Sequence, residues 1–284
     1  MAGRAAPTAR RIRVGAELRR LRERAGLNST QAARLLGVGQ GQLSNVETAR
    51  FGVSPQRVRA MADIYSCGDH AFVEALSAIA EDRSRGWWEE YRAMLPTGLL
   101  DLAELEHHAA RLRTAHTAHI PGLLQTAEHA REIYHQAIPA LGPHEIEHRV
   151  SHRLKRQTVI HRSHSPVPYQ AIIHEAALRM QFGGRRVARA QLRHLLQVSE
   201  HRHVTLRVIP FAGGSFPGSG QTVNYLHGQV PRLDTVQLDQ AHGTAFVDGA
   251  EALGHYRQLF ARLEALALPP SLSRDFIHDL AENS

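Results

Sequence analysis

Two short helical patterns separated by a glycine turn constrain the fold of this chain more than any other feature. The first begins with Asn28 and Gln31, whose spacing of three is typical of a capping box at the start of a helix. Gly37 ends that pattern, and a second one follows over residues 40–48. In the second pattern Leu43 and Val46 can reach a core, while polar side chains occupy the other faces. The sequence therefore predicts two short helices joined by a tight turn.

Further helices are expected on both sides of this pair. Residues 16–25 carry apolar side chains at spacings of three and four, and Pro55 suits the first position of a fourth helix. A fifth helix is expected over residues 69–80. These patterns predict an all-α five-helix domain at residues 14–82, preceded by a flexible basic arm at residues 1–13. Its second and third helices form a helix-turn-helix.

The positive charge of the chain is concentrated in this domain. The net charge is +7, and residues 1–65 hold twelve arginines against four acidic residues, a balance of +8. The remaining residues together carry −1. Arginines near phosphates release condensed counterions, so this distribution favours a polyanion as partner. A solvated arginine-rich helix face explains the charge alone equally well, and the helix pattern decides in favour of duplex DNA.

The second helix of the pair is the expected reader of DNA bases. Glutamine and asparagine can bond to adenine through two atoms in the major groove, whereas arginines outside the groove hold phosphates. The residues predicted to contact DNA are Ser29, Thr30, Arg34, Gln40, Gln42, Ser44, Asn45 and Arg50.

Residues 27–47 resemble the lambda-repressor-like, xenobiotic-response-element (XRE) class of helix-turn-helix regulators. The matching positions are Gly26-Leu27, Ala33, Leu36-Gly37-Val38, Leu43-Ser44, Val46-Glu47 and Arg50. The chain departs from that class at three positions: Ser29 replaces a usual glutamine, Ala32 replaces a usual leucine, and Gly41 removes one base-reading side chain. We therefore expect modest specificity from one domain and a need for a homodimer on an inverted-repeat operator.

The remaining residues, 83–284, are expected to form an α+β domain with a small sheet and several helices. The expected helices cover residues 87–94, 102–113, 125–137, 144–160, 184–200, 251–266 and 271–282. The expected strands cover residues 167–174, 204–210, 221–226 and 235–239.

Four ordered motifs in this second domain also resemble a known family. They are Gly-Trp-Trp-Glu-Glu-Tyr at 86–91, Ile-Pro-Gly-Leu-Leu-Gln-Thr at 120–126, Glu-Ala-Ala-Leu at 175–178 and Val-Ile-Pro-Phe-Ala-Gly-Gly at 208–214. Their order is similar to that in the C-terminal domain of unassigned function found in WhiJ-like regulators of filamentous high-GC bacteria. The resemblance implies a regulator, usually a repressor, often encoded beside a small protein partner that modulates it.

Several residues suggest further sites, each with a simpler explanation. Twenty histidines suggest a metal, but their close pairs lack further ligands at the right spacing, so we expect no metal and no cofactor. The glycine-rich stretch 213–220 follows an expected strand but lacks the residues of a phosphate loop, so it is interpreted as a connector and a candidate pocket lip. Aromatic residues form the candidate partner or ligand site, although core or interdomain packing is the default interpretation of the first three: Trp87, Trp88, Tyr91, Phe211 and Phe216.

These patterns predict a DNA-binding transcription regulator, expected to be a repressor, whose second domain receives a signal from a small protein partner or a ligand. The alternative is an antitoxin-like protein that neutralises a small neighbouring protein and represses the shared operon. No catalytic residues are predicted, and we expect a protein that is not an enzyme. A single cysteine, Cys67, and the lack of an apolar run of ~18–20 residues favour the cytoplasm over a membrane, with nucleoid association when DNA is bound.

Overall fold

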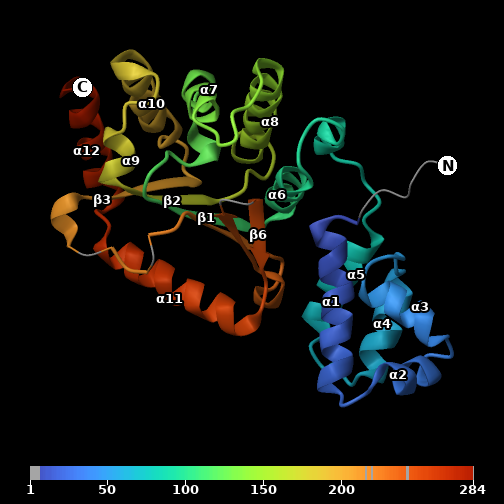
Figure 1. Cartoon of the computed structure of the whole chain (residues 1–284). Coiled ribbons are helices and arrows are strands. Elements are labelled where there is room, and N and C mark those ends of the chain that lie inside the picture. Colours follow the sequence, from blue (N-terminus) through green and yellow to red (C-terminus); the bar gives the residue numbers. More distant parts are fainter. Residues whose placement is uncertain (1–6, 215, 219, 241–242, 284) are drawn as a thin grey trace. The chain divides into compact units, whose positions relative to one another are not determined.

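The computed structural model describes residues 7–214, 216–218, 220–240 and 243–283. The chain divides into two compact units, Met1–Trp87 and Trp88–Ser284 (Figure 1). This division lies five residues beyond the predicted boundary between residues 82 and 83. Within the described ranges, no helix has both the length and the apolar character needed to cross a membrane.

The first unit consists of the five predicted helices. They are α1 (Ala9–Arg24), α2 (Ser29–Leu35), α3 (Gln40–Glu47), α4 (Pro55–Ile64) and α5 (His70–Glu81). The prediction of a flexible arm over residues 1–13 is wrong for residues 9–13, because α1 begins at Ala9. Arg13, a residue of the predicted arm, is buried in this helix at 7% exposure. Residues 1–6 of the predicted arm lie outside the described residues.

Local signals in the sequence begin these helices as predicted. The Asn28 side chain accepts a hydrogen bond from the Gln31 backbone, and the Gln31 side chain accepts one from the Asn28 backbone, which completes the capping box of α2. Pro55 occupies the first turn of α4, where Ser54 caps the Arg57 backbone nitrogen. The core below these caps is formed by fully buried apolar side chains: Leu18, Ala32, Leu43, Val58, Met61, Phe72 and Leu76.

The second unit is an α+β domain built on one sheet. Its strands are β1 (Arg111–His116), β2 (Tyr169–His174), β3 (Val204–Ile209), β4 (Val223–His227), β5 (Thr235–Gln240) and β6 (Gly243–Val247). Its α-helices are α6 (Thr97–His108), α7 (Ala127–His135), α8 (Pro143–His161), α9 (Glu175–Arg179), α10 (Gly184–Val198), α11 (Ala250–Leu266) and α12 (Pro270–Asn283). Short 3-10 turns occur at Trp87–Tyr91, Gly122–Leu124, Phe211–Gly213 and Pro231–Leu233.

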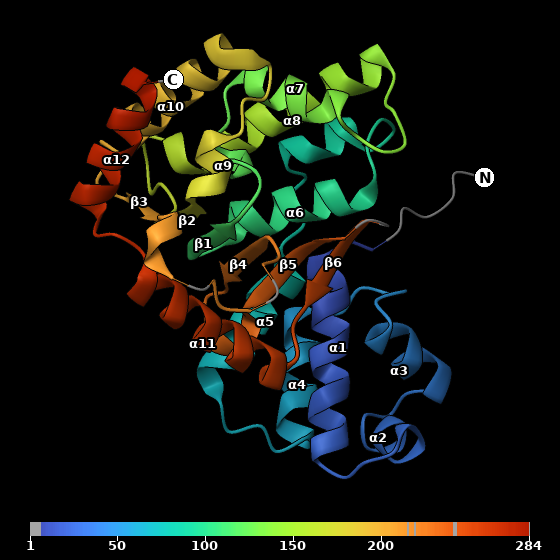
Figure 2. The ribbon, with the colours of Figure 1, turned by 60° about the vertical axis from the view of Figure 1, so that its left-hand side comes forward.

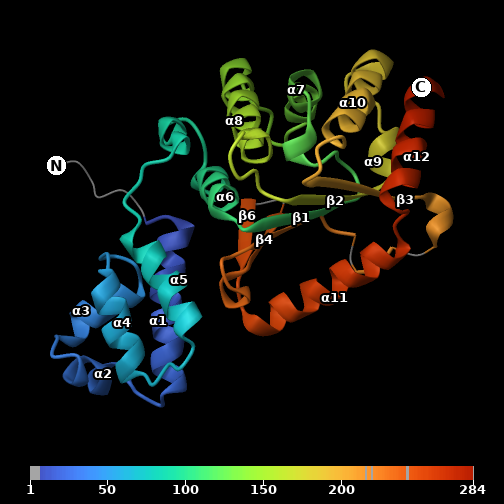
Figure 3. The same ribbon diagram turned by 180° about the vertical axis from the view of Figure 1, so that it is seen from behind.

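The six strands follow the order β3-β2-β1-β4-β5-β6. The pairs β1–β2 and β2–β3 are parallel, whereas β4, β5 and β6 continue the sheet by antiparallel pairing from β1. Helices α6 to α10 and α12 lie on one face, and α11 lies on the other (Figures 1, 2 and 3). Each face has its own apolar core, with Ile160 and Leu195 on the first side and Phe260 and Leu263 on the second.

Three local predictions in this unit are wrong. Residues 111–113, expected at the end of a helix, belong to β1, whose buried side chains include the polar Thr114 and His116 and so lack the usual apolar alternation. The edge strand β6 is rich in small residues and was not expected. Residues 87–94 form only a short 3-10 turn at Trp87–Tyr91 instead of a helix.

Candidate nucleic-acid interface

The position of α3 depends on a close approach to α1 at Gly15. A Cβ atom built on Gly15 would lie 2.5 Å from the Glu47 carbonyl oxygen and 2.7 Å from that of Val46. Any side chain there would therefore displace the end of α3. Leu43, at 2% exposure, inserts from α3 into the same core. The contact between α1 and α3 thus fixes which face of α3 is exposed to solvent.

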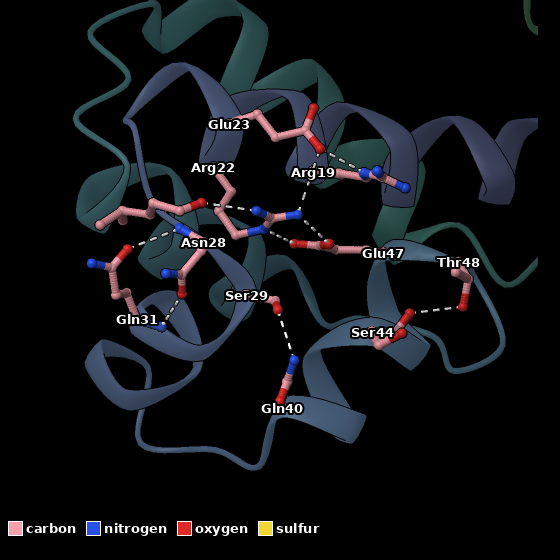
Figure 4. Close-up of polar contacts among 11 residues, drawn as sticks. Arg19, Arg22, Glu23, Asn28, Ser29, Gln31, Gln40, Ser44, Glu47 and Thr48 are labelled. Atoms are coloured by element: carbon pink, nitrogen blue, oxygen red, sulfur yellow. Dashed lines mark hydrogen bonds and ion pairs between the residues drawn. The ribbon is translucent and has the colours of Figure 1, made fainter.

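An ion pair between Arg22 and Glu47 joins the ends of α1 and α3 (Figure 4). Arg22 donates from Nε to Glu47 Oε1 at 2.7 Å and from Nη2 to Oε2 at 2.9 Å, while its Nη1 donates to the Leu27 carbonyl at 2.8 Å. The hydrogen bonds to Glu47 raise the pKa of Arg22. Both side chains are less than one-tenth exposed, so the ion pair that joins α3 to α1 is largely shielded from water.

The turn between α2 and α3 brings the first residues of both helices together. Gly37 adopts φ +64°, a left-handed conformation that glycine accepts without steric cost, and so ends α2 sharply. After the turn, Gln40 Nε2 donates a hydrogen bond to Ser29 Oγ at 2.8 Å (Figure 4). This bond uses one of the two N–H groups of the Gln40 amide and leaves the other N–H and Oε1 for a base. Ser29, which departs from the XRE pattern, thus orients the predicted base-reading residue.

The other predicted base-reading residues lie on the outer side of α3. At 100° per residue, Gln40, Gly41, Ser44 and Asn45 fall within an arc of roughly 140° opposite Leu43, whereas Gln42 lies further round. Gln40, Gln42 and Ser44 are exposed and Asn45 is half-buried. The surface therefore presents amide and hydroxyl groups in a row, with a gap at Gly41.

Most arginines of the first unit are engaged within the unit. Ion pairs to acidic side chains involve Arg10, Arg13, Arg19, Arg20, Arg22 and Arg59. Arg57 donates to the Leu36 carbonyl. Among the described residues of this unit, the arginine side chains without a hydrogen-bond or ion-pair partner are those of Arg11, Arg24, Arg34, Arg50, Arg83 and Arg85. The positive charge available to phosphates is therefore smaller than the balance of +8 suggests. Among the predicted DNA contacts, Arg34 and Arg50 are the arginines whose charge is not paired with a described residue of the unit.

The aromatic residues proposed as a partner or ligand site lie in two different surroundings. Trp88 and Tyr91 are buried at 3% and 6% exposure, Trp88 against the ring of His107 and Tyr91 through a 2.7 Å hydrogen bond to Ser151. Their burial favours the packing alternative. Phe211 is 57% exposed, and both it and the half-buried Phe216 lie edge-on to His174. In the part of the chain that the structure describes, no group of three or more His, Cys, Asp or Glu residues is placed to hold a metal.

Sequence reasoning did not single out two residues that position α3. Gly15 is an isolated glycine inside a helical pattern, a signal that often marks close packing. In the sequence, Arg22 is one of many arginines and nothing near it indicates its partner, because Glu47 lies 25 residues away.

Thr30, a predicted DNA contact, is exposed, as such a contact requires.

Comparison with known proteins identifies both units. A family described as a helix-turn-helix domain matches residues 13–76. A family described as a domain of unknown function (DUF5753) matches residues 99–279. No curated protein and no solved structure matches the chain. The first match, together with the exposed polar row of α3, makes the chain a DNA-binding regulator. The chain belongs to the family defined by this C-terminal domain of unknown function, here joined to an XRE-like helix-turn-helix domain.

Proposed function

We propose that this chain is a sequence-specific repressor that reads an operator through the outer side of α3. The observation that carries the proposal is the hydrogen bond from Gln40 to Ser29, which fixes an exposed amide at the start of the predicted recognition helix. Asn45 lies five residues further along the same outer side. An oriented glutamine and a nearby asparagine suit adenine-containing base pairs. The guanidinium groups of Arg34 and Arg50, which have no partner among the described residues, suit the adjacent phosphates.

We further propose that the operator is an inverted repeat bound by a homodimer. Gly41 leaves one position of the reading surface without a side chain, so a single α3 contacts few base pairs. Two copies related by a two-fold axis double the contacts and require half-sites about one helical turn apart, or ~10 bp. The second unit is the expected dimer platform, because the apolar side chains of the first unit are largely used in its own core.

The second unit is proposed to receive a signal and to catalyse no reaction. The signal comes from a small protein partner encoded nearby or from a ligand, and it changes operator affinity by binding one conformation more tightly than another. The antitoxin-like function remains the alternative. Expression of a co-purified neighbour on its own separates the two, because toxicity of that neighbour favours the antitoxin and harmlessness favours the regulator.

Selection of duplexes from a random DNA pool by the full-length protein tests the proposal. We expect enrichment of an inverted repeat and, by light scattering, two chains on each selected duplex. The absence of any enriched sequence would contradict specific reading, and one chain on each duplex would contradict the dimer.

A further inference from the structure

A half-open cavity of about 410 Å³ lies in the second unit at the carboxyl end of β1. It is lined by residues that directly follow β1, such as Thr117 and His119, and by residues that directly precede β4, such as Gln221 and Thr222. At this point the sheet changes from parallel pairing, β1 with β2, to antiparallel pairing, β1 with β4. Carboxyl ends of strands beside a change in strand direction are frequent ligand sites in open sheets.

The sheet presents polar side chains to this cavity where apolar ones would be expected. Thr114, His116 and Asn224 line it, and Thr114 is hydrogen-bonded to the hydroxyl of Tyr169 at 2.9 Å. His116 Nε2 lies 3.4 Å from Asn224 Oδ1, and Asn224 Nδ2 donates to the side-chain oxygen of Gln237. Gln237 is fully buried. These groups are hydrogen-bonded to one another, and a row of polar groups along the wall of a cavity suits a ligand with polar atoms.

Arg153 supplies a positive charge to the same cavity without an acidic partner beside it. Its Nη1 donates to Gln125 Oε1 at 2.6 Å, and its guanidinium lies 4.5 Å from the ring centre of Tyr134. Gln125 is itself held, because its Nε2 donates to the Ile120 carbonyl at 2.6 Å. Among the described residues, Arg153 Nε is buried without a hydrogen-bond partner. Nε lies close to Gly122, so Nη2, which also has no hydrogen-bond partner among the described residues, is the part of this guanidinium that is left for a ligand.

The neighbouring Arg156, by contrast, pairs with an acidic side chain that neutralises its charge. It donates from Nε and Nη2 to both carboxylate oxygens of Glu106, at 2.8 and 2.6 Å, and both side chains are buried. Its charge is thereby neutralised. Asp239 also lines the cavity, but it is exposed and accepts a 2.6 Å hydrogen bond from Gln237. Of the two arginines that line the cavity, Arg153 is therefore the one without an ion-pair partner among the described residues.

The histidines of the cavity are neutral near pH 7. Burial lowers the pKa of His116 to about 4, and the charge of Arg153 contributes to the shift. Burial and the same guanidinium lower the pKa of His119. With Nε2 of His116 directed at the Asn224 oxygen, its Nδ1 is buried and, within the described part of the chain, has no hydrogen-bond partner. This nitrogen is an acceptor for an O–H or N–H group.

We propose that this cavity binds a small organic monocarboxylate that also carries a hydroxyl or N–H group. The carboxylate accepts a charge-assisted hydrogen bond from Nη2 of Arg153, and the donor group reaches His116 Nδ1. The apolar side chains of Leu102, Ile120 and Leu123 line the space for the body of the ligand. One uncompensated guanidinium matches a monoanion better than a phosphate dianion. The proposal rests on the proposed function in one respect, that the bound acid is the signal; binding itself can be tested without DNA.

Isothermal titration calorimetry of the full-length protein near pH 7 tests binding directly. The probes are benzoate, 4-hydroxybenzoate, the neutral 4-hydroxybenzamide and inorganic phosphate. We expect saturable binding of 4-hydroxybenzoate, weaker binding of benzoate, and affinities for the amide and phosphate that are lower by about ten-fold or more. Arg153→Gln should weaken 4-hydroxybenzoate by about ten-fold or more. The matched control is Arg149→Gln on the same helix, which changes an arginine that also lies beside Tyr134 but does not line the cavity.

Three results would overturn the proposal: no saturable binding of either carboxylate, equal binding by wild type and Arg153→Gln, or preference for phosphate. If Arg153→Gln fails to fold, Arg153→Lys keeps the charge and loses the planar guanidinium that places Nη2, so it should still weaken the binding of the carboxylate. Anisotropy with the selected operator is measured on the same samples. Operator binding without acid binding refutes the cavity alone, whereas acid binding without operator binding refutes the proposed function alone.

Discussion

Gly15 has a role that only its lack of a side chain allows. Glycine inside a helix is less favourable than alanine by about 0.5–1 kcal/mol, so its presence in the middle of α1 calls for a compensating contact. That contact is the backbone of α3, which comes too close for a Cβ atom. The residue that positions the predicted recognition helix is therefore not one of the residues that face the DNA.

Gly15→Ala should destabilise the first unit by about 1–3 kcal/mol, because the added methyl group must displace the carbonyls of α3. The matched control is Gly41→Ala, where no described atom lies within 4 Å of the added Cβ. That substitution should stabilise the unit by about 0.5–1 kcal/mol through helix propensity. Urea unfolding monitored by circular dichroism measures both. Equal effects of the two substitutions would contradict the close approach.

At the scale of elements, the Arg22–Glu47 pair fastens α3 to α1 at its C-terminal end. Arg22→Met should cost about 3 kcal/mol of the free energy of unfolding, because it leaves the Glu47 carboxylate buried without a partner. The chain offers a control of similar geometry, since Arg59 also donates two hydrogen bonds of 2.7 Å to Glu74. Both of those side chains are exposed, so Arg59→Met should change stability little. Comparable losses in the two variants would show that burial is not what makes the first pair important.

The elements that sequence reasoning predicted well are those with local signals. The capping box at Asn28, the proline at the start of α4 and the glycine after α2 each act within a few residues, so a short window of sequence contains the whole cause. The elements that it missed depend on distant partners. β1 was not found because Thr114 and His116 face a polar cavity that is completed by Asn224, more than one hundred residues later.

For the candidate site, the sequence predicted which residues of α3 are exposed but not how they are held by other helices. The exposure of Gln40 and Ser44 follows from helical spacing around Leu43, and both are exposed as expected. The link from Gln40 to Ser29 and the pairing of most arginines required knowledge of how separate helices meet, which the sequence alone does not contain. The Arg153 cavity was not predicted, apart from Gly220 at the end of the stretch interpreted as a candidate pocket lip, because its lining comes from several separate segments of the second unit.

At the scale of the whole molecule, the two units should respond differently to mild acid. In the second unit, burial lowers the pKa of His116 and of His129 to about 4 each, whereas an unfolded chain has a histidine pKa near 6.5. Between these values the unfolded state binds more protons than the folded state, so stability falls as pH falls below about 6.5. Each histidine should remove about 1 kcal/mol from the stability of residues 88–284 at pH 5.5 relative to pH 7.

Hydrogen exchange followed by mass spectrometry measures this effect for each unit separately. Peptides from the second unit should lose protection between pH 7 and pH 5.5, after correction for the intrinsic exchange rate. His129→Asn removes one of these buried histidines and should reduce the dependence on pH. Protection that is independent of pH in wild type, or an unchanged dependence in the variant, would be inconsistent with buried neutral histidines.

The central claim is that α3 reads bases while the arginines beside it hold phosphates. The measurement that tests it most directly is the affinity of wild type, Asn45→Ala and Arg50→Ala for the selected operator and for a random duplex, by fluorescence anisotropy at one salt concentration. Asn45→Ala should weaken operator binding by about 1–3 kcal/mol and leave random binding nearly unchanged. Arg50→Ala should weaken both duplexes equally. If Asn45→Ala weakened both duplexes equally, α3 would not be the element that reads the sequence.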